Sequence, residues 1–168
     1  MSEPHERGRG HRGKRQDVHE RALGVLAVRQ RSRREIQHRL ERAGFGPEAV
    51  GEELDRLQQV GLIDDEAFAR SVVEHSFGTR KEGRRVVASR LISAGIAPDA
   101  AKAALDAVGG GEEERADALA AAKAAKLSGL APDAAYRRLY GMLARRGYAP
   151  DVARRAARRA LAVEAFED

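Results

Sequence analysis

The residues most able to do chemistry in this sequence are arginines and lysines, and they gather in clusters. Residues 29–42 contain six Arg against two Glu, residues 48–74 contain eight acids against two Arg, and residues 131–160 contain eight Arg against two Asp. Guanidinium groups bind phosphates or carboxylates through several hydrogen bonds. Basic stretches that alternate with an acidic one therefore predict contact with nucleic acid or with a patterned protein surface. The alternative interpretation is that these charges only keep helix faces in water.

The candidate binding residues share a place on three predicted basic helices, at 32–43, 81–94 and 132–146, and on a last helix whose arginines pair at i, i+4. They are predicted to contact acidic side chains or DNA phosphates, without base specificity, because the aromatic residues are too few for base stacking. The candidates are Arg33, Arg34, Arg39, Lys81, Arg84, Arg85, Arg90, Arg137, Arg138, Arg145, Arg146, Arg154, Arg155, Arg158 and Arg159.

Catalytic chemistry is not predicted. The chain has no Cys, which excludes thiolate metal sites and disulfides, and His19, His38 and His75 are isolated from one another in the sequence. The acidic runs 64–66 and 112–114 open predicted helices, where capping and the helix dipole explain them. Gly109–Gly111 precede Glu where a phosphate-binding loop needs Lys. We expect no enzyme, no cofactor and no metal.

Length and composition indicate a soluble protein. The chain of 168 residues carries a net charge of +5 and has an isoelectric point near 10.0. No apolar run approaches the roughly 18 residues that a membrane span needs, and no secretory signal is present, so we expect a cytoplasmic monomer that does not bind membranes. Residues 1–16 combine Gly with positive charge and are predicted to form a disordered basic tail. That tail either attracts phosphates or only aids solubility.

A repeat explains how the chain positions its basic helices. The run Leu40–Glu48 recurs at Leu91–Asp99 and at Leu143–Asp151, with spacings of 51 and 52 residues. In each copy a helix ends at Gly, one large apolar residue packs back, and Pro followed by an acid begins the next helix. These patterns predict a helix-turn-helix corner that occurs three times.

The sequence therefore predicts an all-α fold of three tandem three-helix repeats in an elongated curved array. The predicted parts are the tail at 1–16, repeat 1 at 17–63, repeat 2 at 64–108, a Gly hinge at 109–111 and repeat 3 at 112–168. The predicted helices are 17–30, 32–43 and 47–60, then 65–78, 81–94 and 98–108, then 112–127, 132–146 and 150–166. The predicted structural corner residues are Gly44, Pro47, Gly61, Asp64, Asp65, Phe68, Gly95, Pro98, Gly147 and Pro150.

The junction between the first two repeats is the most distinctive run. Gly61 is predicted to end a helix, Leu62 and Ile63 to enter a core, and Asp64 or Asp65 to cap the helix that carries Phe68. The run Gly61–Ala69, the basic segment Lys81–Arg85 and the corner Leu91–Ile96 resemble the RecX family of bacterial regulators of the RecA recombinase. The resemblance spans about residues 20–165.

This resemblance implies a cytoplasmic, non-enzymatic protein that binds in the groove of the RecA–DNA filament. It implies suppression of the RecA ATPase, strand-exchange and coprotease activities. On this hypothesis the basic helices contact RecA acids or DNA phosphates, while the acidic stretches 48–74 and 112–117 set the register. Two alternatives remain open, namely a stand-alone DNA-binding module and a helical scaffold for an unrelated protein.

Overall fold

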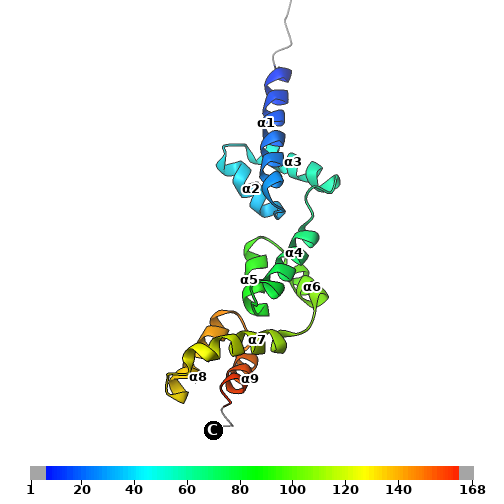
Figure 1. The fold of residues 1–168 in the computed structure, drawn as a ribbon. Helices are drawn as coiled ribbons and strands as arrows, with labels where there is room; N and C mark the ends of the chain where they lie inside the picture. Colours follow the sequence, from blue (N-terminus) through cyan, green and yellow to red (C-terminus); the bar gives the residue numbers. More distant parts are fainter. Residues whose placement is uncertain (1–6, 163–168) are drawn as a thin grey trace, which may run out of the picture. The chain divides into compact units, whose positions relative to one another are not determined.

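The computed structural model describes the backbone of residues 7–162 and the side chains of residues 17–162, and this part of the chain contains helices and no strand. The prediction of an all-α fold is therefore confirmed. The helices in Figure 1 are α1 (Arg7–Val28), α2 (Arg33–Arg42), α3 (Pro47–Gln59), α4 (Asp65–Gly78), α5 (Arg84–Ser93), α6 (Pro98–Val108), α7 (Glu112–Ala124), α8 (Pro132–Arg145) and α9 (Pro150–Leu161), with a short 3₁₀ helix at Ala125–Leu127.

Three corners join the second and third helices of the repeats. Gly44, Gly95 and Gly147 have φ angles of 91°, 89° and 88°, which L side chains rarely adopt. The amide of Phe45 donates to the Leu40 carbonyl and that of Tyr148 to the Leu143 carbonyl, both at 3.2 Å, as in a Schellman motif. Pro then opens each third helix, where its missing N–H leaves no hydrogen bond unmade.

The described part of the chain divides into two compact units, one formed by the residues up to 68 with 94–96 and the other by residues 69–93 with those from 97 onward. In unit 1, helices α1, α2 and α3 pack on one another around a core that includes Val18, Ile36, Leu40 and Leu54. These apolar residues recur at the helical spacing that the amphipathic pattern predicts.

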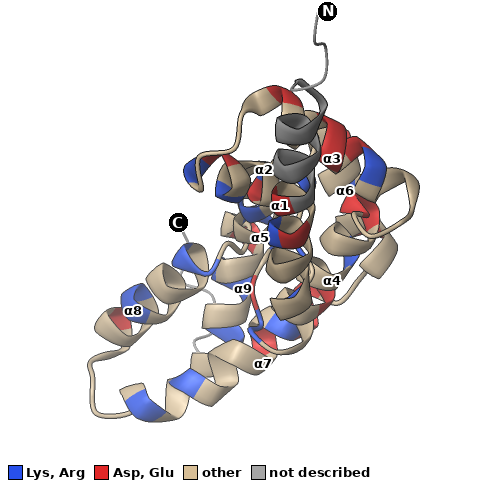
Figure 2. Ribbon diagram, turned by 90° about the horizontal axis from the view of Figure 1, so that it is seen from above, with Lys and Arg blue, Asp and Glu red and all other residues tan. Residues whose placement is uncertain are grey.

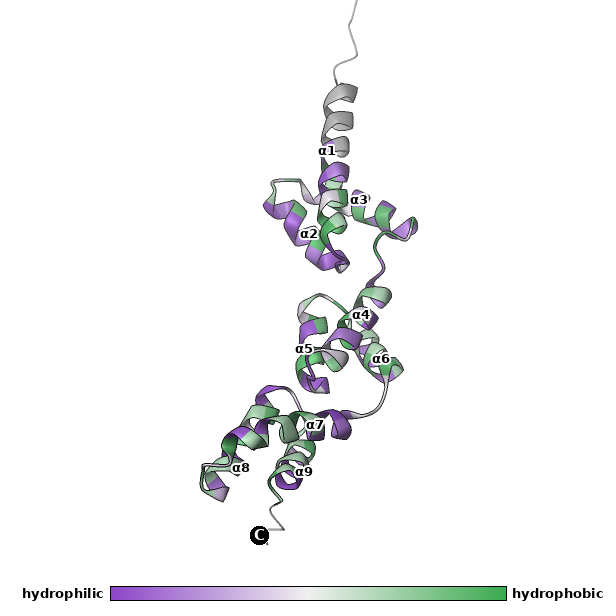
Figure 3. Ribbon diagram, viewed as in Figure 1, coloured by the Kyte–Doolittle hydropathy of each residue, from purple (hydrophilic) through white to green (hydrophobic). Residues whose placement is uncertain are grey.

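Unit 2 contains α5, α6 and the whole of the third repeat. Helices α7, α8 and α9 gather around Leu139, Leu143, Tyr148 and several alanines of α7 and α9. Figure 3 shows hydrophobic and hydrophilic stretches alternating along these helices. The small alanine side chains allow α7 and α9 to pack closely beside the larger side chains of this core.

The starts of α2 and α5 are each fixed by hydrogen bonds to the glycine corner of the following repeat, within one unit in both cases. In unit 1, Ser32 Oγ accepts from the Glu35 amide at 3.1 Å and donates to the Ala94 carbonyl at 2.6 Å. In unit 2, the amides of Gly83 and Arg85 donate to the carbonyls of Arg146 and Gly147 at 2.9 and 3.1 Å. The start of the second helix in one repeat thus meets the glycine corner of the next repeat.

Two helix starts differ from the prediction. Helix α1 begins at Arg7 and not at Asp17, although Gly8, Gly10 and Gly13 in the added turns have low helix propensity. The rest of the predicted tail, residues 1–6, lies outside the described residues, as do residues 163–166 of the last predicted helix. Helix α5 begins at Arg84 and not at 81, because Lys81 has a φ of 52° and the Glu82 amide donates to the Ser76 carbonyl.

The apolar corner after α3 is also only partly as predicted. Ile63 is buried, but the Leu62 side chain is 51% exposed and that of Val60 is 65% exposed. Gly61 has a φ of 76°, and the amides of Leu62 and Ile63 both donate to the Leu57 carbonyl. This tight turn directs one of the two consecutive side chains into the core and the other into water.

The glycine run between α6 and α7 lies inside unit 2. Gly109 and Gly111 have φ angles of 69° and 72°, so the run reverses the chain through conformations that suit glycine. Glu112, which begins α7, accepts a hydrogen bond from the Arg84 amide at 3.1 Å. The predicted hinge motion at 109–111 stays a prediction, as does the curved array. Within the described residues, no helix is both long enough and apolar enough to cross a membrane.

Candidate functional site

Three of the predicted binding residues occupy equivalent positions in the three repeats. Arg34, Arg85 and Arg137 are separated by 51 and 52 residues, the spacings of the glycine corners. All three side chains are exposed, and none has a carboxylate partner among the side chains that the structure describes. Each repeat therefore has one exposed arginine without an ion pair at this position of its second helix, in the first turn of α2 and α5 and in the second turn of α8.

The arginines that precede two of these residues are engaged inside the fold. Arg33 pairs with Asp55 at 2.7 Å, and Arg84 pairs with Asp106 at 2.5 Å, which joins the second helix of a repeat to its third helix. Hydrogen bonds from Lys102 and from Arg84 lower the pKa of the Asp106 carboxyl. Both arginines are partly buried, and their ion pairs position the helices. Their neighbours Arg34 and Arg85 are more exposed.

Other predicted residues of repeats 2 and 3 also serve internal contacts. Arg90 donates to both carboxylate oxygens of Glu82 at 2.7 and 2.8 Å and to Ser76 Oγ at 2.7 Å. The Arg146 guanidinium donates to the Arg80 carbonyl at 2.6 Å. The Lys81 carbonyl accepts from the Tyr148 hydroxyl at 2.5 Å, while the Lys81 side chain is exposed. Lys81 thus lies before the helix on which the sequence places it.

The last helix carries two arginine ladders with different surroundings. Arg155 and Arg159 face α7, where Glu113 accepts from them at 2.6 and 3.3 Å and Asp117 lies 3.3 Å from Arg159. The hydrogen bond from Arg155 is the main reason why the pKa of the Glu113 carboxyl is lowered. The ladder of Arg154 and Arg158 has no such partner in the described part of α7, α8 or α9.

The cations that remain available to a partner are therefore a subset of the predicted ones. They are side chains without an ion pair or a side-chain hydrogen bond in the described part of the chain. Figure 2 marks the positions of Lys and Arg in blue, several of them along α8. The set consists of Arg34, Arg39, Lys81, Arg85, Arg137, Arg138, Arg145, Arg154 and Arg158.

Several acids of the predicted acidic stretches hold the fold together. Asp64 Oδ1 accepts from the Ala67 amide at 2.9 Å and so caps α4, as predicted. Asp65 Oδ1 instead accepts from the Arg33 amide at 2.8 Å and caps α2. Glu112 does the same for α5. This second role was not predicted from the sequence, although the shared position of Asp65 and Glu112 at the start of a repeat could have indicated it.

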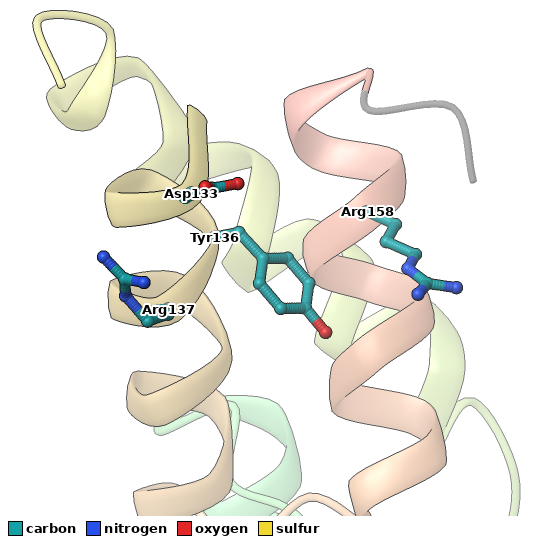
Figure 4. A pocket seen from close by; sticks show the side chains of 4 residues that line it. All are labelled: Asp133, Tyr136, Arg137 and Arg158. Carbon is teal, nitrogen blue, oxygen red and sulfur yellow. The ribbon is translucent and has the colours of Figure 1, made fainter. Parts of the chain in front are cut away.

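A pocket of about 240 Å³ lies between α8 and α9 and is lined by Asp133, Tyr136, Arg137 and Arg158. Figure 4 shows the Tyr136 ring pointing from α8 toward α9, with the side chain of Arg158 extending from α9. The Tyr136 ring stacks on Tyr140, with centroids 6.1 Å apart and planes inclined by 18°. The sequence pattern gave no functional role to Tyr136, and its place beside arginines was missed.

Groups of metal-binding type are not found close together within the described residues. The arrangement of exposed guanidinium groups can bind anions by charge-assisted hydrogen bonds. It contains no paired nucleophile and base that could carry a covalent step.

Comparisons with known proteins identify the three repeats. The family models for the first, second and third three-helix domains of RecX match residues 19–57, 64–105 and 111–157. The regulatory protein RecX of Thermobifida fusca is 34% identical over 90% of this chain and 85% of its own length. The regulatory protein RecX of Streptomyces coelicolor is 39% identical over 84% of this chain and 76% of its own length.

Solved structures support the same fold. The crystal structure of RecX from Lactobacillus salivarius has a TM-score of 0.76 with 21% sequence identity, covering 90% of this chain and 99% of that one. A second crystal structure, of a regulatory protein RecX, has a TM-score of 0.75 over 90% of this chain and 72% of that one. With three domain models matched in order and relatives above 30% identity, the chain belongs to the RecX family of regulatory proteins.

Proposed function

We propose that this protein binds in the groove of the cytoplasmic RecA–DNA filament and regulates RecA, mainly by suppressing its ATPase, strand-exchange and coprotease activities. The observation that carries the proposal is the ordered match of all three RecX domains over residues 19–157. The equivalent arginines Arg34, Arg85 and Arg137 support it, because a helical filament presents equivalent surfaces at regular intervals.

The proposed mechanism uses several weak contacts together. An exposed ion pair contributes about 0–1 kcal/mol by itself. Contacts made by three linked repeats add in free energy, because the first contact raises the effective concentration of the others. A chain that bridges filament protomers in this way holds them in one arrangement and hinders the changes that accompany ATP turnover or subunit addition.

The test is the single-stranded-DNA-dependent ATPase rate of the cognate RecA, titrated with this protein at fixed moderate salt, beside a gel shift on the same DNA without RecA. Inhibition at concentrations too low to shift naked DNA is expected, since it reports recognition of the filament itself. An unchanged ATPase rate, or inhibition only where DNA is saturated, contradicts the proposal.

A charge-reversal variant sharpens this test. Replacing Arg34, Arg85 and Arg137 together by Glu is expected to raise the half-inhibitory concentration by more than about tenfold, because three attractive contacts become repulsive. The matched control replaces Arg70, Lys123 and Lys126 by Glu, which gives the same change in net charge at exposed positions that have no ion pair among the described residues. Equal loss of inhibition in both variants would show that total charge, and not the equivalent arginines, is responsible.

A stand-alone, non-sequence-specific DNA-binding module is the second candidate. It is favoured by the exposed arginines without ion pairs in the described third repeat, namely Arg137, Arg138, Arg145 and Arg154. This candidate predicts binding to naked single- or double-stranded DNA that weakens steeply with salt, because released counterions drive it. The gel shift, repeated over a range of salt concentrations, decides between the two.

A further inference from the structure

The pocket between α8 and α9 replaces an ion pair that the first two repeats contain. Arg33 pairs with Asp55 between α2 and α3, and Arg84 pairs with Asp106 between α5 and α6. The third repeat follows the second at a spacing of 52 residues, so Tyr136 is equivalent to Arg84 and Arg158 is equivalent to Asp106. In the third repeat the arginine has thus become tyrosine and the aspartate has become arginine.

This double replacement leaves the cation Arg158 beside the Tyr136 ring without the ion pair that the earlier repeats have at these positions. Tyr136 and Arg158 line the pocket of about 240 Å³, together with Arg137 and Asp133. The Arg158 guanidinium has no carboxylate partner in the described residues, whereas the equivalent positions of the earlier repeats, 55 and 106, hold aspartates that pair with Arg33 and Arg84. Stacking on Tyr140 holds the Tyr136 ring at the pocket wall.

We propose that this pocket binds a single carboxylate side chain, Asp or Glu, from an acidic segment of a partner protein. The carboxylate accepts hydrogen bonds from Arg158, and its methylene groups pack on the Tyr136 ring. The incoming acid restores the pairing that Asp55 and Asp106 supply internally in the first two repeats. The inference rests on the proposed function in so far as the partner is the filament protein.

Asp133 favours a protein carboxylate over a DNA phosphate. A nucleic-acid strand carries a negative charge at every nucleotide, so neighbouring phosphates would be repelled by the Asp133 carboxylate at the pocket wall. A protein segment can instead place a lysine or arginine beside its acid, and that cation pairs with Asp133. The pocket therefore fits an acidic residue that has a basic neighbour.

The test is a two-dimensional NMR titration of the full-length protein that follows the Arg158 side-chain Nε–H and the Tyr136 ring signals. The probes are a short blocked peptide in which glutamates alternate with lysines and leucines, and a single-stranded oligothymidylate. We expect saturable shifts of both signals with the peptide at a midpoint at least tenfold below that of the oligonucleotide. An equal or lower midpoint for the oligonucleotide, or no shift with the peptide, overturns the inference.

Two variants separate binding at the pocket from general attraction. The double variant Tyr136→Arg with Arg158→Asp copies the Arg84–Asp106 pair, lowers the net charge by one and is expected to raise the peptide midpoint about tenfold or more. Arg158→Gln, with the same charge change, is expected to do likewise. Lys123→Gln is the control of equal charge change and is expected to leave the midpoint unchanged. Equal effects in all three variants overturn the inference.

The RecA ATPase assay keeps this inference distinct from the proposed function. Peptide binding without ATPase inhibition supports the pocket and contradicts the proposed filament regulation. ATPase inhibition without peptide binding contradicts the pocket alone.

Discussion

At the scale of single residues, an ion pair joins Glu82, in the segment before α5, to Arg90 on α5. Glu82, 12% exposed, receives two hydrogen bonds from Arg90, whose other contact is Ser76. The hydrogen bond from Arg90 lowers the pKa of the Glu82 carboxyl, and the same bond raises the pKa of Arg90. A two-point pair with little exposure contributes more than an ordinary surface ion pair.

Stability at acid pH should depend on Glu82. Because its pKa is lowered in the folded state, the unfolded chain binds more protons near pH 4, and the stabilisation is lost as the pH falls through the folded pKa. The wild type should therefore lose thermal stability between about pH 5 and pH 3, near the ordinary carboxyl pKa. Glu82→Gln should cost about 2 kcal/mol at pH 7 and flatten part of this slope in melting curves. An unchanged slope would contradict the role of Glu82.

Tyr148 should stabilise the fold up to high pH. Its hydroxyl donates to the Lys81 carbonyl, its side chain is 1% exposed, and burial raises its pKa to about 12. The neutral phenol therefore stabilises the fold fully below about pH 10, and this contribution disappears as the pH rises toward 12. Tyr148→Phe should cost about 1 kcal/mol at neutral pH, measured by urea unfolding. Wild type and variant should converge at alkaline pH, and parallel curves would contradict this account.

At the scale of elements, the three glycine corners have the same backbone and different neighbours. A β-carbon on Gly44 would meet nothing within 4 Å, whereas one on Gly95 would lie 2.5 Å from Arg34 Cδ. A β-carbon on Gly147 would lie 2.5 Å from the Val86 backbone nitrogen. The corner therefore acts as a chain reversal in the first repeat and also as a packing surface in the other two.

Alanine substitutions at the three corners should rank by those neighbours. Gly44→Ala should cost about 1 kcal/mol from the left-handed backbone alone. Gly95→Ala should lower the free energy of unfolding by more than this, because the Arg34 side chain must move. Gly147→Ala should lower it the most, by about 3 kcal/mol or more, because the backbone atoms of Val86 cannot move away. Gly24→Ala, in the exposed interior of α1, should stabilise by up to about 1 kcal/mol. Chemical denaturation of the four variants gives the order, and equal costs at Gly44 and Gly147 would refute it.

At the scale of the whole molecule, the third repeat departs from the first two in a consistent way. Helix α8 has 14 residues, whereas α2 and α5 have 10 each. By the repeat spacing, Ala135 inside α8 takes the place that Ser32 and Gly83 hold before α2 and α5. Ser32 and Gly83 contact the glycine corner of the following repeat, whereas Ala135 lies in the first turn of α8. Terminal repeats are often modified in such ways.

Inhibition of RecA should reflect the number of repeats engaged. If the three equivalent arginines act together, reversing one of them should raise the half-inhibitory concentration several-fold. Reversing all three should multiply these effects, because independent contacts add in free energy. Raising the salt concentration should bring the half-inhibitory concentrations of the variants and the wild type closer together, since exposed charges are screened. The ATPase titration of the single and triple variants measures this, and a single variant as defective as the triple would place the whole contact in one repeat.

The sequence by itself determined the local features of this protein. Gly, Pro and acid at fixed offsets specify a helix end, a turn and a new helix, because these residue types act on the backbone next to them. The recurrence of that pattern at Gly44, Gly95 and Gly147 was enough to predict three three-helix repeats. The resemblance to the RecX family rested on the same local runs, and the domain models confirm it.

The tertiary structure decided which charges remain available to a partner. Among 31 basic and 26 acidic residues, local spacing cannot tell that Arg33 pairs with Asp55 while Arg34 stays unpaired, or that Asp65 caps a helix 32 residues earlier. The Tyr136 pocket likewise depends on two helices meeting at a particular distance. Pairing between distant residues follows from helix packing, and hydrogen-bond geometry selects among many possible charge partners only once the helices are in place.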